Sequence, residues 1–313
     1  MIKKQPYGTT IKEQHLASAR DRVHRFFLAG GQVRGAILHG TRMVNEMRAN
    51  HDLGILETLV LGHAYLGAGL LTANLKGSDR IALKIECSGP IKGLEVESNA
   101  FGEVRGHLKQ VPIPIEKPPE SFNLSPFFSA GFIRVTRFLE DAKQPFTGQV
   151  EMHYGSIARD LAWYYLMSEQ IPTAFNLSVK FDTEGHVTGA GGLFLQAMPE
   201  ADEAILADLE NLVAGLPSIG ERFAADVSAP DFVREAFNSH QPEFLADYRV
   251  EFMCHCKRDK IENMLMMLPV TDLKDIRDNG PFPLEIKCHH CNTDYLFDKD
   301  ELVEIYGRRY PNN

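Results

Sequence analysis

The sequence predicts an α+β protein with three parts. These are a mixed α/β core domain over residues 1–199, a helical acidic linker over residues 200–253, and a small zinc-binding domain over residues 254–313. Three observations support this division: hydrophobic periodicity switches between strand and helix spacing in the first part, negative charge is concentrated in the second, and four of the five cysteines lie in the third. A length of 313 residues also fits about two domains.

The first part mixes helical and strand-like patterns. Residues 14–28 and 53–75 place apolar side chains at helical spacing, and residues 33–38 are typical of a strand. The glycines at 62, 67 and 69 indicate that the second helix is closely packed and does not span a membrane. The remaining predicted elements are strands at 81–89, 93–98, 103–108, 176–182 and 189–198 and a helix at 157–169.

Composition restricts the class of protein. A hydrophobic content of 44% and a charged content of 24% are typical of a soluble globular chain. We find no apolar run of the roughly 18 residues that a membrane helix needs, and the first 15 residues lack the apolar core of a secretory signal. We therefore expect a cytoplasmic protein without a membrane partner. In such a reducing compartment, paired cysteines bind metal or are redox-active.

The acidic segment is unusual because it is also apolar. Residues 200–253 contain 12 acidic residues, 3 Arg and no Lys, a net charge of −9; residues 1–199 carry 21 basic and 19 acidic residues, and residues 254–313 carry 9 and 11. An apolar stripe at a spacing of three or four predicts an amphipathic helix that ends at Pro217; its members are Ile205, Leu206, Leu209, Leu212, Val213 and Leu216. Such a helix can dock on another surface, and repulsion among its acids would weaken the docking. An ordinary helical subdomain fits the pattern equally well.

The cysteine pattern predicts a metal site. Cys254 and Cys256 are two residues apart, 31 residues follow Cys256, and Cys288 and Cys291 then have knuckle spacing. Two close pairs of thiolates can form a tetrahedral zinc site, and the same sulfurs can form disulfides. Asn292 follows the knuckle and tolerates the left-handed backbone conformation that this position often needs.

Four other residues are candidate ligands or redox groups. A histidine could replace one thiolate, although four sulfurs already complete the shell; the candidates are His255, His289 and His290. The fifth thiol, Cys87, lies on a predicted strand and is expected to be a small core residue.

The last 60 residues are expected to fold around this site. The pattern predicts helices at 256–268 and 271–280, a hairpin at 284–297 with the second cysteine pair in its turn, and a helix at 298–306 capped by Asp298. Because so short a segment has a marginal core, metal binding should supply much of its folding free energy.

The chain resembles the redox-regulated 33 kDa chaperonin family, heat shock protein 33. The resemblance rests on the C-x-C and C-x-x-C pairs with the following Tyr295-Leu296-Phe297, and on upstream blocks that include GQVRG at 31–35, LLTANL at 70–75, SEQIP at 168–172 and GAGGLFLQAMP at 189–199. It covers about residues 20–306. The sequence departs from the family in an extended N-terminus, an insertion at residues 281–283, and Asn292 where glycine is common.

The resemblance implies an ATP-independent holdase. The reduced form would hold one Zn²⁺ and be inactive. Oxidation would then form the disulfides Cys254–Cys256 and Cys288–Cys291, release zinc, unfold the last domain and the linker, and expose a surface for unfolding client proteins. The oxidised form would be a homodimer. We place the client-binding surface on the acidic segment and the face beneath it, with the residues Ile205, Leu209, Leu212, Leu216, Phe232 and Phe237.

Two other classes of function are less consistent with the sequence. A zinc-ribbon protein that binds nucleic acid would carry a basic face, whereas the last 114 residues are acidic. A metal-dependent enzyme needs an open coordination position, which a closed shell of four cysteines does not provide. The chain also has no G-x-S-x-G or H-E-x-x-H motif, so we expect neither catalysis nor a nucleic-acid partner.

Overall fold

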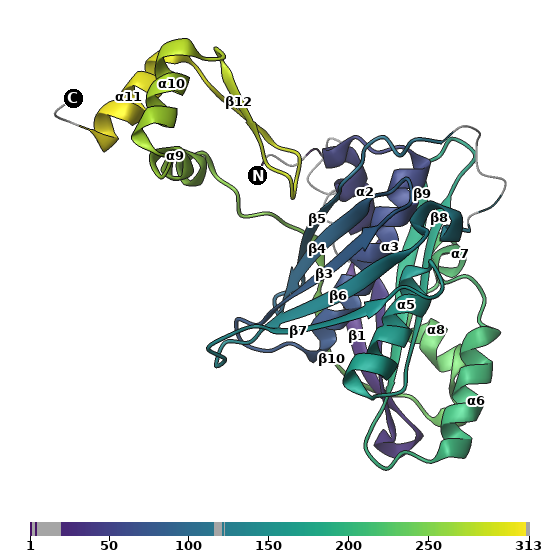
Figure 1. Ribbon diagram of the computed structural model, residues 1–313. Helices are drawn as coiled ribbons and strands as arrows, with labels where there is room; N and C mark the ends of the chain where they lie inside the picture. Colours follow the sequence, from purple (N-terminus) through teal and green to yellow (C-terminus); the bar gives the residue numbers. More distant parts are fainter. Residues whose placement is uncertain (2–3, 5–19, 116–120, 122, 311–313) are drawn as a thin grey trace. The chain divides into compact units, whose positions relative to one another are not determined.

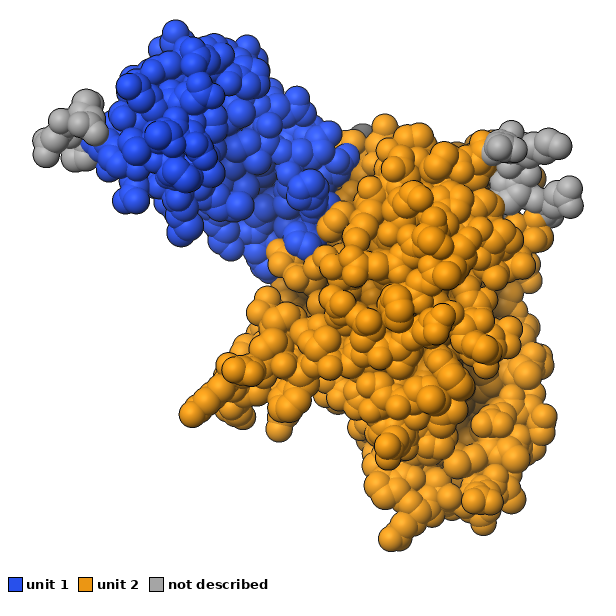
Figure 2. All heavy atoms as spheres, in the orientation of Figure 1, with its two compact units in different colours: residues 1–3, 253–313 blue, residues 4–252 orange. Residues whose placement is uncertain are grey.

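The computed structural model describes residues 1, 4, 20–115, 121 and 123–310. The chain forms two compact units, one of residues 4–252 and one of residues 253–313 with the first three residues (Figure 2). Residues 200–252, predicted as a separate linker, lie within the larger unit, and the small unit begins one residue before the predicted start of the last domain.

A five-stranded antiparallel sheet forms one layer of the larger unit (Figure 1). Its strands, in spatial order, are β10 (Glu243–Arg249), β1 (Arg22–Leu28), β2 (Val33–His39), β9 (Val187–Ala197) and β8 (Thr173–Phe181). A short turn of helix, η1 (Ala29–Gly31), joins β1 to β2. Both faces of the central strands are buried, so β9 is an almost continuous apolar run.

The helix predicted at residues 14–28 is wrong over residues 22–28, which form β1; residues 14–19 lie outside the described part of the chain. Val23 pairs with Leu38 on one face of the sheet, whereas Phe26 and Leu28 point into a core cluster on the other. A strand buried on both faces lacks the alternation that identifies strands. The spacing of three between Val23 and Phe26 therefore resembled a helix.

The second layer is a six-stranded sheet with β7 at one edge. Its order is β11 (Glu251–Phe252), β5 (Glu103–Leu108), β4 (Gly93–Asn99), β3 (Arg80–Cys87), β6 (Gly131–Phe138) and β7 (Phe146–Glu151). All pairs are antiparallel except β11 with β5. The strands predicted at 81–89, 93–98 and 103–108 are confirmed as β3, β4 and β5. β6 and β7 were not predicted.

Helices fill the space between the two sheets. α3 (Ile55–Leu71), followed by η2 (Thr72–Asn74), contacts both sheets, as does α5 (Ile157–Tyr164) with its π-helical continuation η3 (Tyr165–Glu169). α2 (Thr41–His51) packs beside α3, and α4 (Ser125–Phe128) is a single turn. The helices predicted at 53–75 and 157–169 are confirmed.

The expectation that no apolar run is long enough for a membrane helix is wrong. Residues Ile55–Asn74 form a 20-residue helix of suitable length and hydropathy, but 83% of its apolar window is buried inside the protein. Close packing accounts for the glycines: a Cβ on Gly67 or Gly69 would clash with Leu161 or Leu38. The helix is therefore the core helix between the sheets.

The acidic segment covers the outer face of the first sheet. It forms α6 (Glu203–Ala214), α7 (Ile219–Ala224), α8 (Ala229–Ala236) and η4 (Asn238–His240) before entering β10. We call α6 to α8 the acidic cover. The amphipathic helix predicted from the stripe at 205–216 is confirmed as α6. The prediction of a helical segment is wrong for residues 243–249, because they pair with β1 as an edge strand.

The small unit contains three helices and a hairpin among its described residues. They are α9 (Arg258–Met266), α10 (Val270–Asn279), the strands β12 (Leu284–Lys287) and β13 (Asp294–Phe297), and α11 (Lys299–Arg309). Each predicted element of this part is present, and Asp298 caps α11 through a capping box with Glu301. Eight buried side chains form its core, including Ile261, Leu273, Phe297 and Leu302.

Candidate metal centre

Two loops of the small unit bring the four cysteines together. Cys254 and Cys256 lie in the segment between β11 and α9, and Cys288 and Cys291 lie in the turn between β12 and β13. All four are free thiols, and their sulfur atoms lie within 4.8 Å of one another. Cys254 and Cys291 are buried, whereas Cys256 and Cys288 are half-buried. The group comprises all four cysteines predicted as ligands.

The turn of the hairpin is fixed by backbone hydrogen bonds. The amides of Cys291 and Asn292 donate to the carbonyl of Cys288, at 3.3 and 2.7 Å, and the amide of Cys288 donates to the carbonyl of Thr293 at 2.9 Å. Asn292 has a φ of 54°, so its predicted left-handed conformation is confirmed. These backbone hydrogen bonds therefore fix the turn that carries Cys288 and Cys291.

The first cysteine pair is held through the residue that opens α9. The guanidinium of Arg258 donates to the carbonyl of Leu296 at 2.9 Å, forms a 2.6 Å ion pair with Glu301 and lies 4.3 Å from the ring centre of Phe297. Because Leu296 and Phe297 belong to β13, Arg258 connects the loop of Cys254 and Cys256 to the hairpin of Cys288 and Cys291.

The sulfur geometry fits a tetrahedral metal. Cys254 Sγ lies 3.8 Å from Cys288 Sγ, and Cys256 Sγ lies 3.3 Å from Cys291 Sγ. Four sulfurs around zinc, each at about 2.3 Å, would be separated by about 3.8 Å. Soft thiolate donors favour zinc, copper(I) or iron, and a closed shell of four suits a structural site.

The electrostatics of the cluster favour a bound cation. Hydrogen bonds from Cys288 and Cys291 lower the pKa of Cys254. The bond to Cys254 raises the pKa of Cys288 to about 11, and the bonds to Cys254 and Cys288 raise the pKa of Cys291. Among these three thiols the thiolate is therefore favoured on Cys254, and further negative charge on Cys288 and Cys291 is resisted. A divalent cation would remove that resistance and allow all four to ionise.

Two hydroxyl groups support the cluster and were not predicted from the sequence. The Tyr295 hydroxyl donates to Cys256 Sγ at 3.2 Å, and Thr293 Oγ1 lies 3.2 Å from Cys291 Sγ. Both residues follow the second cysteine pair closely, Thr293 just before β13 and Tyr295 within it, but this position in the sequence does not by itself indicate a contact with a sulfur. His255 and His289 are exposed and His290 is half-buried, and the metal-ligand group contains none of the three.

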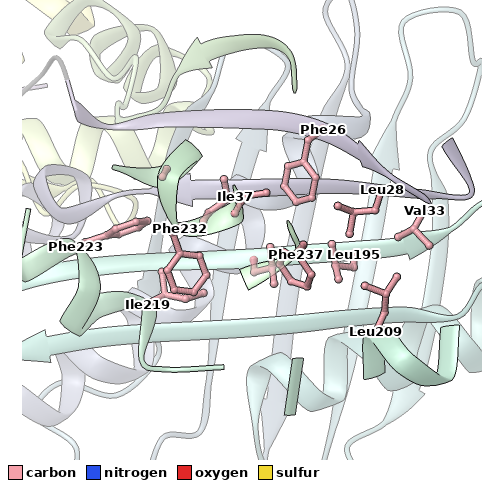
Figure 3. Close-up of a cluster of buried hydrophobic side chains, with 13 residues drawn as sticks. Phe26, Leu28, Val33, Ile37, Leu195, Leu209, Ile219, Phe223, Phe232 and Phe237 are labelled. Carbon is pink, nitrogen blue, oxygen red and sulfur yellow. The ribbon is translucent and has the colours of Figure 1, made fainter. Parts of the chain in front are cut away.

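The residues predicted to bind clients pack in or against one apolar cluster between the acidic segment and the first sheet, and Figure 3 shows three of them, Leu209, Phe232 and Phe237. Leu209, Phe232 and Phe237 are buried in a cluster with residues of the first sheet, including Phe26 and Ile37. Ile205, Leu212 and Leu216 are partly buried against the same cluster. Three of the six side chains are therefore covered in this conformation, and the other three are partly covered. Cys87, on β3, is half-buried, and burial raises its pKa.

Most of the chain is similar to proteins of one family. The family model described as Hsp33 protein matches residues 21–298. The 33 kDa chaperonin of Desulforamulus reducens is 34% identical over 291 residues, which cover 92% of this chain and 98% of the relative. That of Thermotoga maritima is 35% identical over 277 residues, which cover 88% and 93%. The crystal structure of the 33 kDa chaperonin (heat shock protein 33 homolog) from Thermotoga maritima matches with a TM-score of 0.83 and 32% identity, covering 94% of this chain and all of that chain.

The class of protein follows from these findings together. The fold is shared with a solved 33 kDa chaperonin over 94% of this chain, and the similar relatives are chaperonins, which supports a chaperone function and the binding of unfolded proteins. The four clustered cysteines of the small unit are compatible with a bound metal ion. The chain belongs to the Hsp33 protein family.

Proposed function

We propose that this protein is a redox-regulated holdase that binds unfolding proteins without ATP. In the resting state the four cysteines are reduced and hold one zinc ion, and client binding is off. The observation that carries the proposal is the group of four free thiols within 4.8 Å, in a small unit that follows directly in sequence from an acidic segment covering an apolar sheet face.

Zinc would be held by Cys254, Cys256, Cys288 and Cys291. When bound, it would cross-link the loop before α9 to the turn of the hairpin. The core of the small unit has eight buried side chains, of which Ile261 and Leu265 come from α9 and Tyr295 and Phe297 from β13. Such a core is small for independent folding, so the stability of the unit depends on this cross-link.

Oxidation of the cysteines would remove the ligands. A thiolate attacks a peroxide oxygen, which gives a sulfenic acid and hydroxide; the neighbouring thiolate then attacks that sulfur and expels the sulfenic oxygen as hydroxide, which takes up a proton from solvent to give water. Following the family resemblance, the pairs are Cys254–Cys256 and Cys288–Cys291. A disulfide across a single intervening residue closes a strained ring that is incompatible with the metal-bound loop. The two loops would then separate and the small unit would unfold.

Unfolding would reach the acidic cover through the chain itself. β11 directly precedes the small unit, contains only two residues, and among the described strands pairs only with β5. The strand before it along the chain, β10, is an edge strand of the other sheet, and its pairing with β1 is interrupted by a register shift. Short and irregular edge strands contribute little pairing energy. Loss of the small unit would therefore allow this strand region to detach and release the helices that precede it.

The cover is itself weakly attached at α6. Only Leu209 of its twelve residues is buried, and a cavity of about 90 Å³ lies between α6 and the sheet, lined by Val33, Leu195, Leu206 and Val213 among others. In contrast, α7 packs closely on β9. A Cβ on Gly189 would lie only 2.0 Å from the carbonyl oxygen of Gly220. We infer that α6 leaves first and uncovers the apolar face on which clients bind.

The remaining parts of the proposal follow from the resemblance. The protein would act in the cytoplasm under oxidative stress and form a homodimer when oxidised, and its partners would be unfolding proteins. The exposed face would include Ile205, Leu209, Leu212, Leu216, Phe232 and Phe237 together with the sheet residues that they cover.

A peroxide titration tests the proposal. Zinc-loaded, reduced protein is titrated with hydrogen peroxide while a chromogenic chelator reports zinc release, and light scattering of a thermally unfolding client is followed in parallel. We expect zinc release and suppression of aggregation to rise together. A Cys87→Ser variant, which lacks the thiol outside the cluster, should behave as the parent does. The proposal is wrong if oxidised and reduced protein both fail to suppress aggregation, and binding of RNA by the zinc-loaded form would instead support a nucleic-acid function.

A further inference from the structure

Three of the ten methionines of the chain lie within four residues at the end of α9. The side chain of Met264 is 63% exposed and that of Met267 is 81% exposed, whereas Met266 is partly buried against the core of the small unit. Methionines of the larger unit include fully buried core residues, such as Met43 and Met47 on α2. The end of α9 therefore presents thioether sulfurs to solvent in the unit that contains the thiol cluster.

We propose that Met264, Met266 and Met267 form a second oxidant-reactive site. The oxidant is hypochlorous acid, which transfers its oxygen atom to the thioether sulfur. The sulfur supplies the electron pair, chlorine leaves as chloride, a proton is released, and the product is methionine sulfoxide. The inference rests on the proposed redox function, because the sulfoxides would act on the same unit that the cysteines hold folded.

The position of Met266 explains how this modification would affect folding. Its neighbours on α9, Ile261 and Leu265, are buried in the core, and Met266 packs against the same cluster. A sulfoxide is a strong hydrogen-bond acceptor, and burying it without a donor is unfavourable. Met264 and Met267 would be oxidised first because they are exposed. Met266 would follow when α9 moves away from the core, and its sulfoxide would then hinder the return of α9.

The two oxidations would differ in how they are reversed. A thiol reductant restores disulfides to cysteines but leaves methionine sulfoxide unchanged, which requires methionine sulfoxide reductases. After exposure to hypochlorous acid, the small unit would therefore remain easier to unfold even when its cysteines have been reduced. Oxidation of the three methionines would therefore persist in the small unit after its disulfides have been reduced.

The experiment separates sulfoxides from disulfides in the full-length chain. The protein is treated with hypochlorous acid, reduced with dithiothreitol and reloaded with zinc. Peptide mass spectrometry then locates added oxygen, and the rate of zinc transfer to a chelator reports opening of the small unit. We expect oxygen on residues 264–267 and zinc transfer about fivefold faster than in untreated protein. Treatment with methionine sulfoxide reductases A and B should restore the original rate.

Matched variants assign the effect. A Met264→Leu/Met266→Leu/Met267→Leu variant keeps the side-chain volume close to the original and should show no lasting acceleration. A Met167→Leu variant removes a methionine that is 54% exposed in the larger unit, and should respond as the parent does. Should the triple variant fold poorly, the double variant Met264→Leu/Met267→Leu, which changes only the exposed residues, should show a reduced acceleration.

Two results would overturn the inference. One is the absence of oxygen on residues 264–267 at a dose that oxidises Met167. The other is a lasting acceleration in the triple variant equal to that of the parent, or one that the reductases do not reverse. Both results are independent of client binding. Failure of the proposed holdase function would instead appear in the peroxide titration, as a loss of aggregation suppression.

Discussion

The two faces of the five-stranded sheet are covered in contrasting ways. On one face lies α3, in which 15 of 17 residues are buried, and on the other lies α6, in which only Leu209 of twelve is buried. The first is an apolar helix enclosed between two sheets, and the second belongs to a segment with a net charge of −9. Under the proposed function, one face of the sheet has a permanent cover, α3, and the other has a cover that can be removed, the acidic cover.

The attachment of the acidic cover supports this distinction. Its polar contacts with the sheet include the ion pair of Lys180 on β8 with Glu221 on α7, whose side chains are 45% and 58% exposed. Exposed ion pairs contribute about 0–1 kcal/mol each. The cover is therefore held mainly by apolar contacts with the sheet, and a modest loss of those contacts would release it.

Removal of a metal ligand should produce the largest difference in protease protection between α3 and the acidic cover. In Cys291→Ser, a buried member of the thiol cluster is lost. Structural zinc sites contribute about 10 kcal/mol or more to folding, so the small unit should unfold even in reducing buffer. Limited proteolysis should then cut α6 to α8 while α3 stays protected. Cys87→Ser should retain zinc and resist proteolysis. Equal cleavage of α3 and α6 would contradict the comparison.

A pair of leucines tests the two faces directly. Leu66 on α3 is fully buried, and Leu209 on α6 is 4% exposed. Leu66→Ala should lower the free energy of unfolding of the larger unit by about 2–5 kcal/mol, as measured by urea denaturation. Leu209→Ala should have a smaller effect on that transition but should increase hydrogen exchange in α6 and client binding by the reduced protein. Equal effects of both variants on global stability would indicate that the acidic cover is as permanent as α3.

The helix that carries Leu209, the thiol cluster and the strands β1 and β10 show how much could be predicted from the sequence. The stripe through Leu209 predicted α6 because its apolar residues repeat with helical period, and the cysteine spacing predicted the thiol cluster. β1 was mistaken for a helix because Val23 and Phe26 are buried on opposite faces of the sheet. The pairing of β10 with β1 joins residues more than 200 positions apart, such as Arg22 and Arg249. No local pattern encodes such a contact, nor the hydroxyl contacts of Tyr295 and Thr293 with the sulfurs.

Acid should weaken the permanent cover through a histidine on α3. Desolvation lowers the pKa of His63 from 6.5 to about 4 in the folded protein. Above pH 6.5 the ring is neutral in both the folded and the unfolded state. Below it the unfolded state gains a proton first, so stability is lost as the pH falls toward 4, by about 1–3 kcal/mol. Urea midpoints at pH 7 and pH 4.5 should differ less in His63→Gln than in the parent. An identical pH dependence would exclude this role.

The smallest expected effect concerns the hydroxyl group that contacts the thiol cluster. In Tyr295→Phe, Cys256 loses a hydrogen bond at 3.2 Å while the buried ring remains. Such a bond contributes about 0.5–1.5 kcal/mol, and its loss leaves more electron density on the sulfur. Zinc release at a fixed peroxide concentration should therefore be accelerated about threefold. Tyr310→Phe, in the same unit and outside the cluster, should leave the rate unchanged. A slower release in Tyr295→Phe would show that the hydroxyl promotes the attack of Cys256 on peroxide. The contact would then make the thiol cluster easier to oxidise.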